Sequence, residues 1–169
     1  MDRTKKTLLE ILGILLLFFI LGLVVYFAGS GIAKTFLKAG GASHAAWSKK
    51  YFNLAMYMTV IACVFTYVWY LMARFLLKIH GPQLVGKRTI WAVIGVVNIL
   101  ACIVFPYFYT RNDGVLKLHV LIYVLFILLL GIVGYYVASL FATPACYKYT
   151  PLGARMVRSA QFRKRRAKE

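Results

Sequence analysis

The order of apolar and charged positions divides this chain into four long apolar runs. No Lys, Arg, Asp or Glu occurs in residues 11–33, 51–73, 89–110 or 118–147. Each run can cross a bilayer as a helix, since about 30 Å of hydrocarbon requires roughly 20 residues at about 1.5 Å per residue. Backbone groups in lipid must be bonded within the chain, so each run is predicted to be helical. The expected fold is all-α, an integral membrane four-helix bundle.

The polar segments between the runs place the expected ends of the helices. The predicted spans are about 8–29, 51–78, 88–109 and 116–142. Together they form one transmembrane domain, 1–145, and the remaining residues, 146–169, form a basic tail. No sequence repeat and no second domain is indicated.

The segment between the first two spans leaves two alternatives open. Gly29-Ser30-Gly31 is expected to end the first helix, because glycine favours chain ends and turns. Within the following loop, 30–50, the apolar Ile32 and Phe36 alternate with lysines, which is typical of a short helix lying on a membrane surface. An ordinary loop fits as well. The first run could also be a signal peptide, but it is longer than the usual apolar core and no clean cleavage site follows it.

Composition and the placement of charge define the membrane orientation. The chain is 62% hydrophobic and only 15% charged, whereas soluble domains average about a quarter charged. With the N-terminus inside, 15 of the 21 Lys and Arg residues fall on inner segments and 6 on outer loops. Basic residues accumulate on the cytoplasmic side of short loops, so both termini are predicted to be cytoplasmic. A multi-pass protein of the cell inner (plasma) membrane is therefore expected.

Small and weakly polar residues indicate which helix faces pack together. Helices associate in lipid by close packing, and small residues mark those interfaces. At about 100° per residue, such residues form one narrow stripe on the second helix and another on the fourth. Helix three contributes Asn98, whose amide requires a partner in hydrocarbon and is expected to join helices rather than to line a substrate path. Helix one lacks such a stripe and is predicted to face lipid or a partner. The predicted packing residues are Ala55, Thr59, Ala62, Thr66, Asn98, Gly131, Gly134 and Ala138.

Candidates for chemistry are few. The only carboxylates are Asp2, Glu10, Asp113 and Glu169, and none lies deep within a predicted span. General acid–base catalysis and ion coupling both need such groups. No zinc-protease, phosphate-loop, nucleophile-elbow or CxxC motif occurs, and neither of the histidines on the outer side, His44 and His119, is set deep within a span as a haem ligand would be. We expect no enzyme activity, no cofactor and no metal site.

The basic tail is the most strongly charged segment. Basic residues near a membrane attract anionic lipid headgroups by about 1 kcal/mol each. The same charges could dock an acidic cytoplasmic partner; nucleic acid is less expected for so short a segment beside a membrane. The predicted docking residues are Arg155, Arg158, Arg163, Lys164, Arg165 and Arg166.

Two functional hypotheses remain from the sequence. The first is a non-catalytic subunit of a larger membrane complex, for transport, secretion or defence. Its helices would contact membrane lipids and other subunits, of the same or another chain, and its tail would provide the cytoplasmic dock. The alternative is a small homo-oligomeric channel or pore, with Asn98 and the small-residue faces around its axis. The nearly apolar spans disfavour a water-filled pore, although an apolar constriction can act as a gate.

Overall fold

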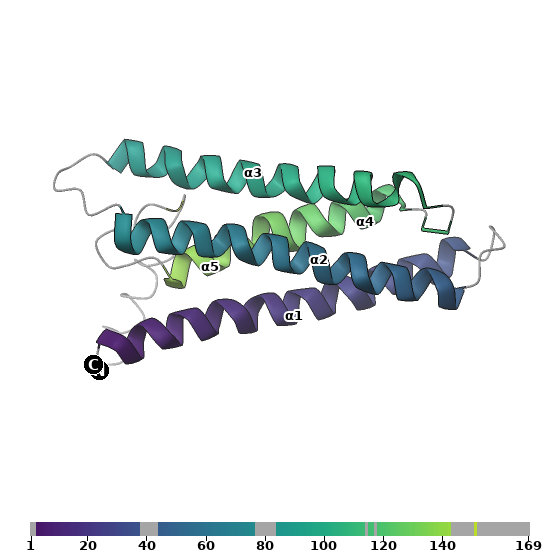
Figure 1. The fold of residues 1–169 in the computed structure, drawn as a ribbon, viewed down its shortest axis with the longest axis horizontal. Helices are drawn as coiled ribbons and strands as arrows, with labels where there is room; N and C mark the ends of the chain where they lie inside the picture. Colours follow the sequence, from purple (N-terminus) through teal and green to yellow (C-terminus); the bar gives the residue numbers. More distant parts are fainter. Residues whose placement is uncertain are drawn as a thin grey trace, which may run out of the picture.

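The chain folds as four antiparallel helical rods (Figure 1). A computed structural model describes residues 3–37, 44–76, 84–113, 115–116, 118–142 and 151. The elements are α1 (Arg3–Leu37), α2 (His44–Leu71), the π-helical turn η1 (Met72–Leu76), α3 (Leu84–Arg111), α4 (Val120–Leu125), the π-helix η2 (Phe126–Gly134) and α5 (Tyr135–Ala142).

Each rod contains a segment that is long and apolar enough to cross a membrane. These segments are Thr7–Thr35, His44–Arg74, Arg88–Arg111 and Val120–Leu140. The prediction of an all-α, four-helix membrane bundle is therefore confirmed. The first rod is α1, the second α2 with η1, the third α3, and the last the continuous path α4–η2–α5. Which side of the membrane each end occupies stays a prediction.

The rods alternate in direction, so α1 begins and α5 finishes at one end of the bundle, here called the terminal end (Figure 1). At the opposite end, called the loop end, α1 is followed by α2 and α3 by α4. α2 packs against both α1 and α3, and the last rod contacts all three others. α1 and α3 lie on opposite sides of α2 (Figure 1).

Two expected helix ends are wrong at the loop end. α1 does not stop at Gly29 but continues to Leu37, and α2 begins at His44 rather than at residue 51. The segment between α1 and α2 is thus 38–43, far shorter than the predicted loop 30–50. Residues 32–37 are the last turns of α1, and they form neither of the two alternatives proposed for them. Gly29 lies inside α1 because the Tyr51 ring of α2 packs closely against it.

The last rod also starts later than predicted. It begins at Val120 rather than at residue 116, because the Asp113 carboxylate accepts the backbone N–H groups of Val115 and Leu116 at 2.9 and 3.3 Å. An aspartate that bonds the backbone two or three residues onward favours a turn over a helix. The third rod is slightly longer than predicted, Leu84–Arg111 against 88–109.

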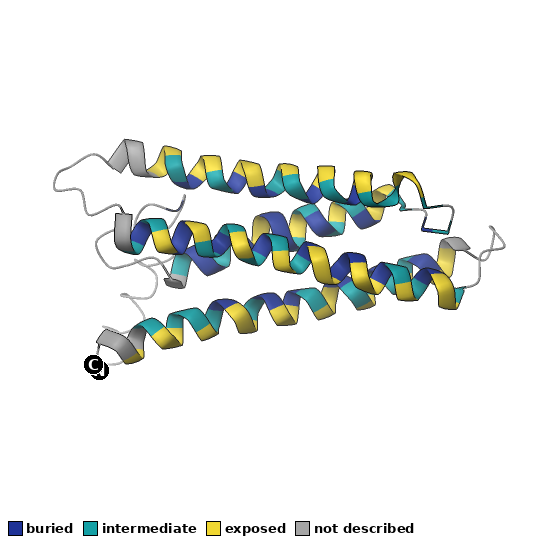
Figure 2. Ribbon diagram, viewed as in Figure 1, coloured by how far each residue is buried: buried dark blue, intermediate teal, exposed yellow. Residues whose placement is uncertain are grey.

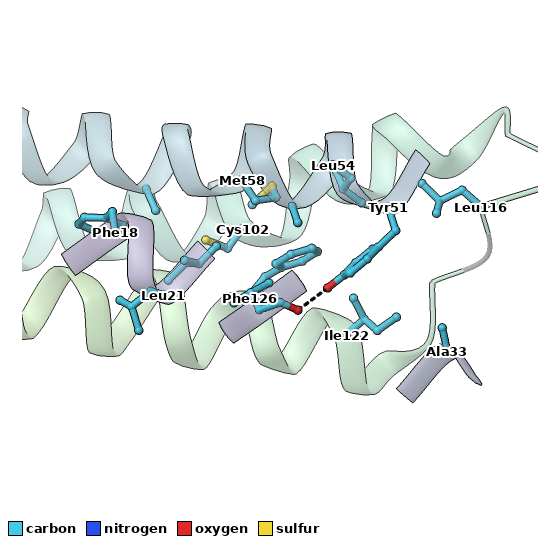
Figure 3. Packing of buried hydrophobic residues seen from close by; sticks show 14 of the residues in the cluster. Phe18, Leu21, Ala33, Tyr51, Leu54, Met58, Cys102, Leu116, Ile122 and Phe126 are labelled. Atoms are coloured by element: carbon cyan, nitrogen blue, oxygen red, sulfur yellow. Dashed lines mark hydrogen bonds between the residues drawn. The ribbon is translucent and has the colours of Figure 1, made fainter. Parts of the chain in front are cut away.

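The core runs along the axis between the rods, and exposed positions face outward (Figure 2). Its fully buried side chains include Ile14, Phe18, Met58 and Phe126, contributed by α1, α2 and η2. Figure 3 shows this packing, with Tyr51 and Phe126 side by side near the loop end. Large side chains therefore fill the centre of the bundle.

The expectation that helix one lies outside the compact core, towards lipid or a partner, is wrong in its first part. α1 packs along α2 and against the last rod, and it buries Ile14, Phe18 and Val25. Its large side chains fit against small residues on other helices. A Cβ atom built on Gly134 would lie 2.9 Å from Cε1 of Phe18. A small-residue stripe on one helix is enough for close packing, so the absence of one on α1 did not exclude α1 from the core.

Candidate functional site

Asn98 joins α3 to the π-helix of the last rod. It is fully buried, and its Nδ2 donates to the carbonyl oxygen of Gly131 at 3.3 Å, in the middle of η2. Its Oδ1 has no hydrogen-bond partner among the described residues. The backbone of η2 bonds in the wider i to i+5 pattern that defines a π-helix. The side-chain amide thus acts between helices and provides no polar lining of an open path.

The predicted small-residue stripes lie between helices. Ala55, Ala62 and Ala138 are buried, as are Thr66, Gly131 and Gly134, whereas Thr59 is half-buried. The two glycines serve different neighbours. Gly134 receives Phe18 and Leu21 of α1, whereas a Cβ on Gly131 would contact Ile99 and Cys102 of α3. The stripe on the last rod therefore accommodates two helices at once.

The two threonines of α2 use their hydroxyl groups within their own helix. Thr59 Oγ1 donates to the carbonyl oxygen of Ala55 at 2.8 Å, and Thr66 Oγ1 donates to that of Ala62 at 3.0 Å. Such a bond to the carbonyl four residues earlier satisfies a hydroxyl without a second helix. Neither hydroxyl is directed to a ligand, and both residues present a small surface to neighbouring helices.

A charged cluster at the terminal end connects α1 to α2 and η1. Glu10 Oε2 accepts a hydrogen bond from Nη1 of Arg74 at 2.5 Å and another from the Tyr70 hydroxyl at 3.0 Å. Arg74 also donates to Oγ1 of Thr7, and its guanidinium lies 5.6 Å from the centre of the Tyr70 ring. The side chains of Glu10 and Arg74 are only 11% and 13% exposed. The carboxylate is thereby held as the counter-charge of an arginine.

This ion pair was not predicted from the sequence. One signal was available. Glu10 directly precedes the charge-free run of the first span, Arg74 directly follows that of the second, and the two residues are predicted to lie at the same membrane depth. Opposite charges at one depth on adjacent antiparallel helices are expected to meet.

A second ion pair lies at the loop end. Lys50 Nζ is 2.8 Å from both carboxylate oxygens of Asp113. The hydrogen bond from Lys50, followed by that from the backbone N–H of Val115, holds the pKa of the Asp113 carboxyl below its usual value. The pair connects the start of α2 to the turn after α3. Because the Lys50 side chain is 43% exposed, solvent screening limits its contribution.

Asp113 should give the bundle a modest pH dependence. Asp113→Asn keeps an oxygen that accepts the backbone N–H groups but removes the ion pair. The free energy of unfolding in detergent at neutral pH should therefore be up to about 1 kcal/mol lower than that of the parent. Because folding lowers the pKa of Asp113, the ionised carboxylate stabilises the folded protein at any pH above the ordinary aspartate pKa. This stabilisation is lost as the pH falls through the lower pKa of the folded state. The difference between parent and variant should therefore vanish in acid. A difference that persists there would contradict this role.

α3 carries a continuous exposed stripe on the side away from α2 (Figure 2). Its members follow the spacing of three and four residues that places side chains on one helix face. Each is at least 40% exposed. The α3 stripe is Val93, Val96, Val97, Leu100, Ile103 and Val104.

The predicted tail residues Arg155, Arg158 and Arg163–Arg166 lie outside the described residues. Within the described part of the chain, no three His, Cys, Asp or Glu side chains gather as metal ligands would. Comparison of the chain with protein-family models, with characterised proteins and with solved structures finds no match.

Proposed function

We propose that this protein is a non-catalytic, multi-pass subunit of a larger membrane assembly for transport, secretion or defence, and that the α3 stripe is its lateral contact. The stripe is the observation that carries the proposal. Five of its six members are Val or Ile, and beyond Val104 the exposed face continues towards the loop end with Tyr107 and Phe108. These β-branched side chains have essentially one χ1 rotamer in a helix, so they lose little conformational entropy when another helix packs on them.

The exposed face of α1 differs in composition. It presents mainly Leu and Phe, which are not branched at Cβ and so have more than one χ1 rotamer in a helix, among them Leu8, Leu12, Leu16, Phe19 and Phe27. Such side chains adapt to fluid lipid tails and would lose more freedom in a fixed interface. The contrast between two faces of one bundle favours α3 as the side that meets another protein and α1 as a lipid-facing side.

The polar groups support a structural role. Glu10 is engaged by Arg74 and Asp113 by Lys50, so both described carboxylates balance a neighbouring cation. A catalytic acid or base needs a proton-exchanging group directed at a substrate. The filled axis of the bundle likewise disfavours a pore through one chain, since Phe18 and Phe126 occupy it.

The tail completes the proposal. Arg155, Arg158 and the run Arg163–Arg166 would bind anionic headgroups or an acidic partner on the cytoplasmic side of the plasma membrane, the side that the excess of basic residues favours for both termini. The transmembrane part would then contact other subunits within the membrane, and the tail would bind at the membrane surface.

The stripe is tested by one bulky substitution. Val96→Trp places a large ring on an exposed position, so the bundle should fold normally while a close helix contact is blocked. In membranes solubilised with mild detergent, the variant should migrate at the mass of the isolated chain, whereas the parent should migrate in a larger complex.

Leu16→Trp is the matched control, because Leu16 is 60% exposed on α1 and Val96 is 55% exposed on α3. This control should leave the complex intact. If Val96→Trp leaves the complex unchanged, the stripe faces lipid and the proposal fails. A complex that contains only copies of this chain would favour the homo-oligomeric channel instead.

A further inference from the structure

A groove with a volume of about 300 Å³ lies between α1 and α2, towards the loop end. Small residues form its floor and larger apolar side chains form its walls. Several of the walls, including Phe19, Phe52 and Val60, are about half exposed, so the groove opens to the surroundings of the bundle. Its lining is Phe19, Gly22, Leu23, Tyr26, Phe52, Ala55, Met56, Thr59 and Val60.

The groove covers the depth of one membrane leaflet. From Phe52 to Val60 it follows α2 for about 12 Å, at about 1.5 Å per residue. One leaflet contributes about half of the roughly 30 Å of hydrocarbon. All lining residues belong to the two spans Thr7–Thr35 and His44–Arg74. The surroundings of the groove are therefore acyl chains.

The floor of the groove is too shallow for another helix. α1 and α2 come close together there, since a Cβ atom on Gly22 would lie 2.8 Å from Oγ1 of Thr59. A helix with its side chains is about 10 Å wide. A volume of about 300 Å³ is at the lower limit of small-ligand sites, which suits one flexible chain rather than a helix from a second copy.

Polar groups mark the loop-end mouth of the groove. The Tyr26 hydroxyl lies 3.4 Å from Oγ of Ser48, a contact between α1 and α2. Lys49 follows Ser48 and precedes Phe52 by three residues, just under one helical turn. It is exposed, and its ammonium forms no hydrogen bond or ion pair with a described side chain. A cation thus stands at the depth where a lipid headgroup begins.

We propose that this groove binds an anionic phospholipid of the leaflet at the loop end. One acyl chain lies against Gly22, Ala55 and Thr59, and the Lys49 ammonium attracts the headgroup, whose phosphate has no cationic group of its own to neutralise it. The site is separate from the basic tail and from the α3 stripe, and it gives the lipid-facing α1–α2 side a binding preference of its own.

The test compares two lipids with identical acyl chains, phosphatidylglycerol and phosphatidylcholine. The full chain is purified in detergent containing equal amounts of both, and native mass spectrometry measures which lipid remains bound. The parent should retain phosphatidylglycerol preferentially. Lys49→Gln should lower the ratio of phosphatidylglycerol to phosphatidylcholine about fivefold, the effect of one basic residue near a headgroup. Arg111→Gln, also exposed at the loop end but on α3, should leave the ratio unchanged.

A second pair of variants tests the groove itself. Val60→Trp should fill the end of the groove that is farthest from the loop end and reduce retention of both lipids, whereas Val64→Trp should not. Val64 is similarly exposed, 52% against 54%, and lies one turn beyond the lining. Thermal unfolding of each variant checks that the bundle is intact. Equal effects of Lys49→Gln and Arg111→Gln, or of the two tryptophan variants, would overturn the site. So would a dimer of the parent that Val60→Trp dissociates, because the groove would then be a contact between copies.

Discussion

Gly29→Ala should destabilise the bundle by about 3 kcal/mol, although it adds a single methyl group. A Cβ atom on Gly29 would lie 2.0 Å from the hydroxyl oxygen of Tyr51 and 2.4 Å from its Cζ. Tyr51 is fully buried, and its hydroxyl donates to the carbonyl oxygen of Val25 at 3.0 Å (Figure 3). The ring would have to leave this position, which disrupts its stacking on Trp47 and leaves its hydroxyl without the bond.

Gly31→Ala is the control two residues away in the same helix. Nothing lies within 4 Å of a Cβ atom built on Gly31, and the position is exposed. Because alanine is the better helix former, this change should be neutral or should stabilise α1 by up to about 1 kcal/mol. Reversible unfolding in detergent, followed by circular dichroism, measures both variants. Equal stabilities would show that Tyr51 does not depend on the space at Gly29.

The same glycine explains why the sequence misplaced the end of α1. Glycine near an apolar run often marks a helix end, and Gly29-Ser30-Gly31 fits that pattern. Here Gly29 lies inside α1 because an aromatic ring of α2 occupies the space above it. The two uses of glycine, chain termination and close approach, look alike in a single sequence. They are distinguished only when the partner residue, Tyr51, is known.

The number of spans could be predicted because it follows from one physical requirement. A stretch without charge that is long enough to cross the hydrocarbon has no alternative to a helix there. The packing partners of each helix depend on how the surfaces of two helices fit together, and the sequence of one helix alone does not show this. Phe18 and Leu21 on α1 fit Gly134 on the last rod, and α1 itself offers no local sign of this contact.

For the candidate sites too, single residues could be predicted from the sequence but their partners could not. Asn98 could be singled out because a lone amide in hydrocarbon requires a partner, although Gly131 could not be named as that partner. The groove and the pairing of Glu10 with Arg74 depend on how α1 and α2 are aligned along their length. That alignment comes from contacts between residues distant in the sequence, such as the Tyr67 hydroxyl with the Ile11 carbonyl at 2.8 Å.

The second large effect is expected at Gly134, where α1 meets the last rod. Gly134→Leu should lower the stability of the bundle by about 3 kcal/mol or prevent α1 from docking. Even the first carbon of the new side chain would lie 2.9 Å from Cε1 of Phe18 and 3.0 Å from Cδ1 of Leu21. Both neighbours are buried, so neither can move aside into solvent or lipid without opening the core.

Val133→Leu provides the comparison that separates packing from hydrophobicity. Val133 precedes Gly134 in the same π-helix and is 40% exposed, so a leucine there should extend into lipid and change stability by less than about 0.5 kcal/mol. Denaturant unfolding in detergent gives the two free energies. Cross-linking of cysteines introduced on the facing sides of α1 and α5 reports separately whether α1 still lies beside α5, which it contacts in the parent. If Gly134→Leu unfolds like Val133→Leu and keeps that cross-link, a leucine fits between α1 and the last rod. The close contact of Phe18 and Leu21 with Gly134 would then not be required for the packing of α1.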